Sequence, residues 1–329
     1  MPDCDITERT SPLEGMKVDF EAYVRQRKAR ESVHIQGNSI PDYAFGLDYE
    51  LRRNLDSIPH LYSLSKKVMN TYVAREVQTY NRRALAVGPG QMPEVYRIAC
   101  ECAQTLGIGV PNIFIAPSTE LNAFTYAFDD IEPIIVIYSG LFERVDHQVL
   151  KAVIGHECGH IQNAHSMYTV VASLLAAGGI GVLSSIPGVG LLTGLLTGGT
   201  QIALATWSRA AEVTADRASV ICSSPEDALR AQMILMYGGA LNVDSESINM
   251  DAIQEQLDLQ LSNIARYDEL LGNDSHPATA RRIAAIREFA ECEVLYSWRP
   301  ELKKPGQTMR SRAETEERCR NVIHITRKG

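Results

Sequence analysis

The sequence lacks several features that would assign it to a common class of protein. Its 329 residues carry a net charge of −8 but no long run of Lys or Arg, which argues against nucleic acid as a partner. No segment recurs along the chain, so a solenoid of repeats is not expected. The opening residues MPDCDITERTSPLEG do not place an apolar stretch after a basic one, so no secretory leader is predicted.

Cysteine is present, but it is not arranged for crosslinks. The seven cysteines are scattered, odd in number, and include no CxxC pair. A disulfide framework or a thiolate zinc site would require regular spacings that this chain does not have. We therefore expect a cytoplasmic protein, and association with a membrane remains an alternative because of an uncharged stretch after His165.

The patterns that are present indicate a mainly α (α+β) protein with a small sheet before a histidine-rich helix. Helical patterns cover about 61–84 and the segment that Pro93 opens, and short β-branched runs follow in VPNIFIAP, LNAFTYAF and EPIIVIYSG. Asp146 is placed to cap the next helix, HQVLKAVIGHECGH. Further helices are expected at about 206–221, 226–238 and 250–271, and in HPATARRIAAIREFAE.

By composition the chain divides into three parts. Residues 1–60 are polar and interrupted by Gly and Pro, and are expected to form an N-terminal extension outside the core. Residues 61–298 are expected to form a single domain, and 299–329 a polar, mobile tail. The position of both ends outside the core motivates the hypothesis that one of them covers the active site and keeps an enzyme latent.

The segment AVIGHECGHIQNAH contains the residues that first suggest chemistry. On a helix, His156 and His160 project from one face about a turn apart. Neutral imidazole is a common zinc ligand, and Glu157 lies where a carboxylate could act on a metal-activated water. The motif alone fits two core histidines with ordinary hydrogen bonds equally well, so a third ligand is needed to decide.

Two candidates for the third ligand differ in position. His165 is one residue away from the HExxHxxGxxH pattern and falls on another side of the helix, so it is interpreted as structural or surface. The segment WSRAAEVTADRAS offers Glu212 and Asp216, four residues apart among alanines that permit close helix packing. Glu212 could bind the metal while Asp216 accepts the other ring N–H of a ligand histidine. The alternative is a solvated acidic face of a helix.

The segment SHPATARRI supplies two further candidates. In a metallopeptidase, His276 could donate a hydrogen bond to the oxyanion of the tetrahedral intermediate, and Arg282 could pair with a carboxylate of the site. A loop histidine and a solvated arginine are the alternatives.

Taken in this order, HECGH, SRAAEVTAD and HPATARRI resemble the HtpX-like and CAAX prenyl-protein endopeptidase superfamily of zinc metallopeptidases, which also includes the Oma-type mitochondrial proteases. The resemblance spans about 93–289 and includes LNAF. It implies a gluzincin fold with a small antiparallel sheet, and one zinc ion held by His156, His160 and Glu212. It also implies Glu157 as general base.

The same resemblance implies roles around the metal. Asp216 would orient a ligand histidine, and His276 would lie near the transition state. Asn122 and Ala123 match the edge strand along which such enzymes bind an extended peptide, a mode that uses main-chain hydrogen bonds. The alternative for these two residues is an interior strand. The expected function is zinc-dependent hydrolysis of peptide bonds in protein substrates, with protein quality control as one role. A catalytically silent zinc-binding, membrane- or partner-binding module is the alternative, and hydrolysis of another bond is not excluded.

An uncharged stretch, 166–208, lies between the two metal-bearing segments and is expected to form an apolar helical hairpin. Pro187 and nearby glycines split it into two arms that reach about 20 residues only with their Ser and Thr included. Three interpretations remain open. The hairpin is buried or forms a subunit interface, it lies on a membrane as a peripheral contact, or it spans the bilayer twice.

Overall fold

The computed structural model describes residues 35–36, 40–128, 131–238, 252, 255–256, 259 and 279–323. Within these ranges the protein is mainly α-helical with a small sheet, as predicted. The helices are α2 (Gly46–Asp56), α3 (Leu61–Val68), the π-helical η3 (Met69–Val73), α4 (Ala74–Arg83), α5 (Pro93–Leu106), α6 (Ser139–Phe142), α7 (His147–Gln162), α8 (Ser166–Ser185), the 3₁₀-helical η4 (Gly190–Leu195), α9 (Gly198–Cys222), α10 (Pro225–Tyr237), α12 (Thr279–Ala290), α13 (Glu293–Trp298), the 3₁₀-helical η6 (Pro300–Leu302) and α14 (Arg312–Ile323).

The main sheet has four strands in the order β3 (Leu85–Val87), β4 (Asn112–Ala116), β6 (Ile131–Tyr138) and β5 (Ala123–Phe128). The prediction of an antiparallel sheet is wrong for one pair, because β4 and β6 run parallel. The chain leaves β4, makes the outer strand β5, and returns as β6 between the two. β5 is therefore an edge strand. A separate pair joins β1 (Ile35–Gln36) and β2 (Ile40–Pro41).

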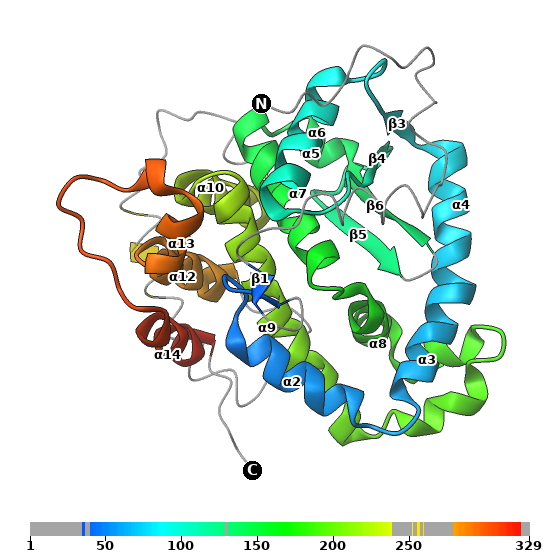
Figure 1. The fold of residues 1–329 in the computed structure, drawn as a ribbon. Coiled ribbons are helices and arrows are strands. Elements are labelled where there is room, and N and C mark those ends of the chain that lie inside the picture. The colour runs from blue at the N-terminus through cyan, green and yellow to red at the C-terminus, as the bar shows by residue number, and fades with distance from the viewer. Residues whose placement is uncertain are drawn as a thin grey trace.

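Alternate side chains of β4 and β6 enter two different cores, as the strand period of two requires. One set joins the main core with α5 and α7, namely Ile113, Ile115, Ile135 and Ile137. The other set joins a smaller core with α4, namely Phe114, Ala116, Ile134 and Val136. Figure 1 shows the sheet between these layers, with α7 and α9 through the middle of the molecule and α12 to α14 on the side away from α4.

Helices α7 and α9 pack closely because α7 carries glycines where they meet. A Cβ added at Gly155 would lie 2.6 Å from Cβ of Cys222, and one added at Gly159 would lie 2.6 Å from Cβ of Ala218. Asp146 caps α7 as predicted, since its carboxylate accepts from the first free N–H groups of the helix at 2.9 and 3.0 Å.

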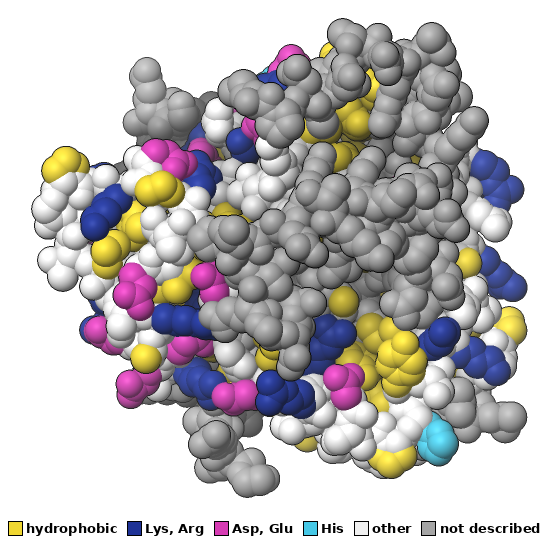
Figure 2. Space-filling view, in the orientation of Figure 1, with side chains coloured by type: hydrophobic (Ala, Val, Ile, Leu, Met, Phe, Trp, Pro, Cys, Tyr) yellow, Lys and Arg dark blue, Asp and Glu magenta, His cyan; other side chains and the backbone are white. Residues whose placement is uncertain are grey.

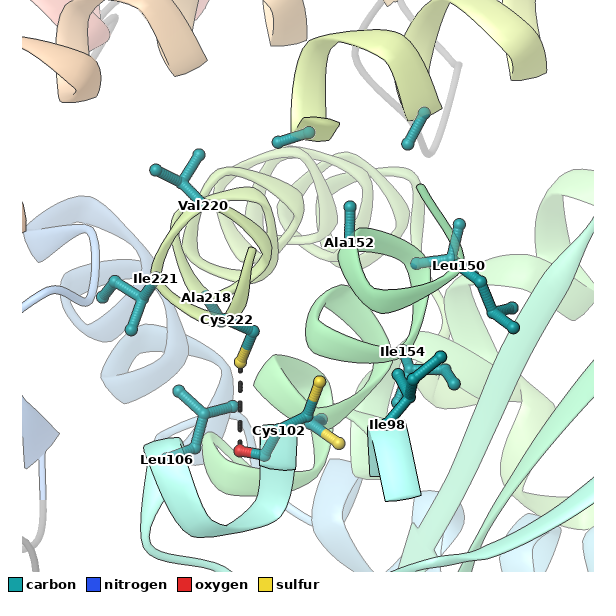
Figure 3. Close-up of a cluster of buried hydrophobic side chains, with 14 of the residues drawn as sticks. Ile98, Cys102, Leu106, Leu150, Ala152, Ile154, Ala218, Val220, Ile221 and Cys222 are labelled. Carbon is teal, nitrogen blue, oxygen red and sulfur yellow. Dashed lines mark hydrogen bonds between the residues drawn. The ribbon is translucent and has the colours of Figure 1, made fainter. Parts of the chain in front are cut away.

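The main core continues from this helix pair onto α5. Figure 3 shows Cys102 and Leu106 of α5 near Cys222 of α9, and Ile98 near Ile154 of α7. The Cys222 thiol donates to the backbone oxygen of Cys102 over 3.9 Å. Burial raises the pKa of the Cys158 thiol, the residue inside HECGH. Thiols of this kind act as small core side chains.

Part of the segment predicted to lie outside the core is packed into it. Tyr43 and Phe45 have no exposed surface, and α2 contacts α9 along its length. The backbone N–H of Phe45 donates to the hydroxyl of Thr214 on α9 over 3.2 Å. Residues before the expected boundary at residue 60 thus belong to the packed domain. The segment was predicted to lie outside the core because α2 carries polar residues on its exposed side, so its composition did not indicate a buried side. Residues 1–34 of that segment lie outside the described ranges.

The predicted C-terminal tail likewise contains an ordered helix. α14 packs against α12, and its Cys319 has no exposed surface. On the face in Figure 2, acidic and basic side chains are interspersed on the side of α12 to α14. Several pair with each other, such as Arg320 with Glu50 of α2 at 2.8 Å. Polar composition alone therefore did not distinguish a docked amphipathic helix from a mobile tail.

The uncharged stretch folds as α8, η4 and the beginning of α9. Its arms pack with α3 around a second core that includes Leu64, Tyr168 and Trp207. Some apolar side chains point outward, with Ile202 59% exposed and Ile180 39% exposed. Among the helices of the described ranges, none combines the length and the apolar character needed to cross a membrane.

Candidate metal centre and cleft

Three potential ligand atoms converge between α7 and α9. His156 Nε2 lies 3.1 Å from His160 Nε2 and 3.4 Å from Glu212 Oε2, and His160 Nε2 lies 3.6 Å from Glu212 Oε1. A tetrahedral metal with ligand distances of about 2.1 Å requires ligand atoms about 3.4 Å apart. The spacing therefore fits one ion such as zinc bound by three protein groups, with the fourth position left over.

The backbone places these ligands by helix periodicity and by close packing. His156 and His160 lie one turn apart on α7, and Glu212 reaches them from α9. Gly159 permits the approach, since any larger residue there would contact Ala215 and Ala218 of α9. His160 and Glu212 are buried, and His156 is 14% exposed at the side chain.

Asp216 and Arg282 lie beside the first histidine. His156 Nδ1 lies 3.0 Å from Asp216 Oδ1, so its N–H donates to the carboxylate and Nε2 is directed at the metal position. Arg282 holds Asp216 at 2.6 and 2.8 Å and approaches Glu212 at 3.2 Å. Gln232 of α10 donates to Asp216 at 3.1 Å.

The charges of this cluster compensate each other. Burial raises the pKa of Asp216, but the Arg282 guanidinium outweighs it, and the net pKa lies below its usual range. Burial lowers the pKa of His156, but hydrogen bonds to Asp216 and Glu212 outweigh it and raise the pKa to about 10. A proton must therefore leave the ring when a metal takes Nε2.

His165 is the residue whose position the sequence interpretation missed. It is 1% exposed, so the surface alternative is wrong, and its Nδ1 lies 2.8 Å from Nδ1 of His160. The helical wheel placed it away from the pair because the wheel assumed a continuing helix. In the structure α7 ends at Gln162, and Ala164 adopts φ of 52°, which turns the chain back.

A partner from the N-terminal segment completes this arrangement. His165 Nε2 donates to Asp48 Oδ2 over 2.9 Å, and Trp207 and Thr214 donate to the same carboxylate at 2.9 and 2.8 Å. A neutral His165 then accepts at Nδ1 from His160, whose Nε2 is left for the metal. Burial lowers the pKa of His160 well below its usual value, which keeps that ring neutral. No sequence motif marks Asp48, which lies 117 residues from His165.

The remaining predicted site residues divide into three cases. Glu157 is 5% exposed and lines the cleft beside the two histidines. Asn122 and Ala123 line the same cleft where the edge strand β5 begins. His276 lies outside the described residues.

The cleft passes over the candidate metal centre from α10 to α4. It encloses about 640 Å³ and is bordered by β5, α7, α8, α10 and α4. A volume of several hundred cubic ångströms is typical of a site that binds a ligand, and a closed structural metal site does not need it. The candidate metal position therefore opens onto space for a ligand.

Comparison with known proteins agrees with these observations. A model of the family described as Peptidase family M48 matches residues 89–290. The plastoglobule-localized metallopeptidase 48 of Arabidopsis thaliana chloroplasts is 25% identical over 216 residues, which are 65% of this chain and 60% of that protein. The match thus covers less than two thirds of the Arabidopsis protein. A protease HtpX homolog of Trichormus variabilis is 27% identical over 242 residues, which are 67% of this chain and 81% of that protein.

Among solved structures, the crystal structure of S. mikatae Ste24p aligns with a TM-score of 0.43 at 17% identity, over 73% of this chain and 61% of that chain. The HtpX-like resemblance of the three sequence motifs is confirmed by the family match and by the HtpX homologs.

Proposed function

The chain belongs to peptidase family M48, and from this membership we propose that it is a zinc-dependent metalloendopeptidase acting on peptide bonds of protein substrates. The observation that carries the proposal is the convergence of His156, His160 and Glu212 at tetrahedral spacings in the wall of an open cleft. These three residues would hold one zinc ion. When bound there, zinc supplies a Lewis acid that polarises a scissile carbonyl and lowers the pKa of water.

Glu157 is proposed as the general base. It follows a ligand on the same helix, it is buried, and it lines the cleft next to both histidines. A carboxylate there can take a proton from water and later deliver it to the leaving amine. A purely structural metal site would not require this carboxylate, which distinguishes the peptidase from a silent zinc-binding module.

The cleft also suggests how a peptide is held. The edge strand β5 lines the cleft, and an extended peptide can pair with such an edge independently of its sequence. Asn122 and Ala123 are proposed to make these contacts. His276 remains proposed as an oxyanion donor. Arg282 is proposed as a positioning residue, because it orders Asp216 and approaches Glu212.

The experiment compares purified wild type with Glu157→Gln for zinc content and for casein hydrolysis. Both proteins are expected to bind one zinc, and the variant is expected to lose activity by a factor of about 10² to 10⁴. Glu143→Gln is the matched control, since Glu143 is exposed and lies outside the cleft. Its activity should equal that of wild type.

Other outcomes separate the alternatives. Zinc binding by both proteins without any hydrolysis would favour a latent enzyme or a silent zinc-binding module. A variant that lacks residues 1–34 would then test whether this segment keeps the enzyme latent. Absence of zinc from the wild type would mean that the two histidines are core residues with ordinary hydrogen bonds. We propose the cytoplasm as compartment and protein quality control as one role. We also propose 166–208 as a surface for peripheral membrane contact or self-association, since Ile202 and Ile180 are exposed.

A further inference from the structure

The α4 end of the cleft is lined by a single helical stripe. Tyr72 of η3 and Glu76 and Tyr80 of α4 are spaced four residues apart, and all three border the cleft. Figure 1 shows α4 on the opposite side of the sheet from α10, so this stripe lies at the end away from Gln232 and Arg282. None of the three belongs to the candidate metal centre.

Glu76 differs from the other acidic residues of the molecule. Glu76 is partly buried and, within the described ranges, makes neither a hydrogen bond nor an ion pair. Every other carboxylate of these ranges is either exposed or has such a partner. Its own helix supplies no cation, because the positions three and four residues away hold Tyr72, Val73, Thr79 and Tyr80. The basic residues of α4 lie elsewhere, with Arg75 exposed.

Tyrosine side chains share the cleft with this carboxylate. Tyr72, Tyr80, Tyr126 and Tyr138 all line it, and burial, with a contribution from the charge of Glu76, raises the pKa of Tyr72, Tyr80 and Tyr126. Phe124 packs against Tyr80, Tyr126 and Tyr138, with ring centroids 5.3 to 5.7 Å apart, which fixes the wall. Burial and the charge of Glu76 raise the pKa of Tyr72, so this phenol stays neutral beside the carboxylate.

A carboxylate that shares a cleft wall with phenol rings suits one kind of ligand. The ring faces attract a cation, the carboxylate neutralises it, and the partly enclosed setting strengthens both effects relative to water. An anionic group would be repelled by Glu76. An uncharged apolar group would leave Glu76 without a partner.

We propose that Glu76, Tyr72 and Tyr80 form a subsite for a lysine or arginine side chain of the bound peptide. The subsite adjoins Tyr126 of β5, the strand beside which a peptide would lie, so it is within the same cleft as the scissile bond. The inference rests on the proposed function, because it assigns part of the specificity of that peptidase.

The test uses fluorogenic peptides that carry lysine, norleucine or glutamate at each position around the cleaved bond. Norleucine has the same chain without the ammonium group. At one position, wild type is expected to cleave the lysine peptide with about tenfold higher kcat/KM. Glu76→Gln should bring this ratio near one, and Glu76→Lys should reverse it in favour of a glutamate peptide. Glu143→Gln, on the exposed surface, should keep the wild-type ratio.

Binding separates failure of the subsite from failure of the peptidase. Dissociation constants of the same peptides are measured on zinc-loaded Glu157→Gln with and without Glu76→Gln. If wild type cleaves no peptide, also after removal of residues 1–34, but the lysine preference in binding depends on Glu76, the hydrolytic function is wrong and the subsite stands. If the lysine preference is absent, or survives Glu76→Gln in both measurements, the subsite is overturned.

Discussion

His165 Nε2 donates to Asp48 Oδ2 over 2.9 Å, and this contact joins α2 to the candidate metal centre. Through His165, the carboxylate fixes the ring of His160, because the two imidazoles meet at their Nδ1 atoms. Partners that fix the orientation of a ligand histidine affect metal affinity even though they do not touch the metal.

We expect Asp48→Asn to lower zinc affinity about 10- to 100-fold. The NH₂ group of the new amide would face one of the three donors, His165, Trp207 or Thr214, and could not accept from it. The ring of His160 would then lose its fixed tautomer. Zinc titration, together with the absorption spectrum of the cobalt-substituted protein, measures the effect. Glu50→Gln on the same helix alters an exposed carboxylate that pairs with Arg320, away from His165, and serves as control. Unchanged affinity and spectrum with reduced stability would make Asp48 merely structural.

The contact of α7 with α9 gives the second prediction. Gly159→Ala places a Cβ 2.6 Å from that of Ala218, so the helices must move apart. The free energy of unfolding is expected to fall by about 1–3 kcal/mol. Zinc affinity should fall as well, since Glu212 is carried on α9. Denaturant unfolding and zinc titration measure the two effects.

Gly181→Ala is the matched control for that substitution. Gly181 is an exposed helical glycine with no atom within 4 Å of an added Cβ. Replacing it should stabilise the protein by about 0.5–1 kcal/mol, because alanine loses less backbone freedom on folding. Equal effects of the two substitutions would contradict the close-packing explanation.

The third prediction concerns the C-terminal helix. Glu316 pairs with the buried Arg217 at 2.5 Å and accepts from the backbone N–H of Gly46 at 2.8 Å. Glu316→Gln leaves Arg217 charged inside the protein without its carboxylate, and removing one partner of such a pair costs about 3–5 kcal/mol. Thermal unfolding of this variant is compared with Glu317→Gln, which alters an exposed neighbour. A mobile tail would give the same melting temperature for both.

The parts of the site that the sequence predicted are those set by local geometry. His156 with His160, and Glu212 with Asp216, are pairs four residues apart, so a helix places each pair on one face whatever the rest of the fold does. Arg282 could be proposed because it lies within the segment HPATARRI, where an arginine could pair with a carboxylate of the site. Local periodicity also predicted the helix at 61–84, apart from its π-helical turn at Met69–Val73.

What the sequence did not predict depends on tertiary contacts. Asp48 meets His165 across 117 residues, and His165 points inward only because α7 ends at Gln162. β4 and β6 are parallel because β5 lies outside them, an order that strand patterns do not encode. The stripe of Tyr72 and Glu76 has an ordinary amphipathic pattern, and only the cleft beside it gives it meaning.

The last prediction concerns removal of the metal. We expect zinc bound by His156, His160 and Glu212 to stabilise the folded state, because these groups converge when α7 and α9 are packed. At free zinc one hundred times the dissociation constant, the gain is about 2.7 kcal/mol. A chelator should therefore lower the melting temperature of wild type, and added zinc should restore it. Glu212→Gln, which lacks the α9 ligand, should respond much less to chelator. An equal response of both proteins would mean that zinc binds elsewhere. If the chelator did not change the melting temperature of wild type, the proposal that these three residues bind a metal would be wrong.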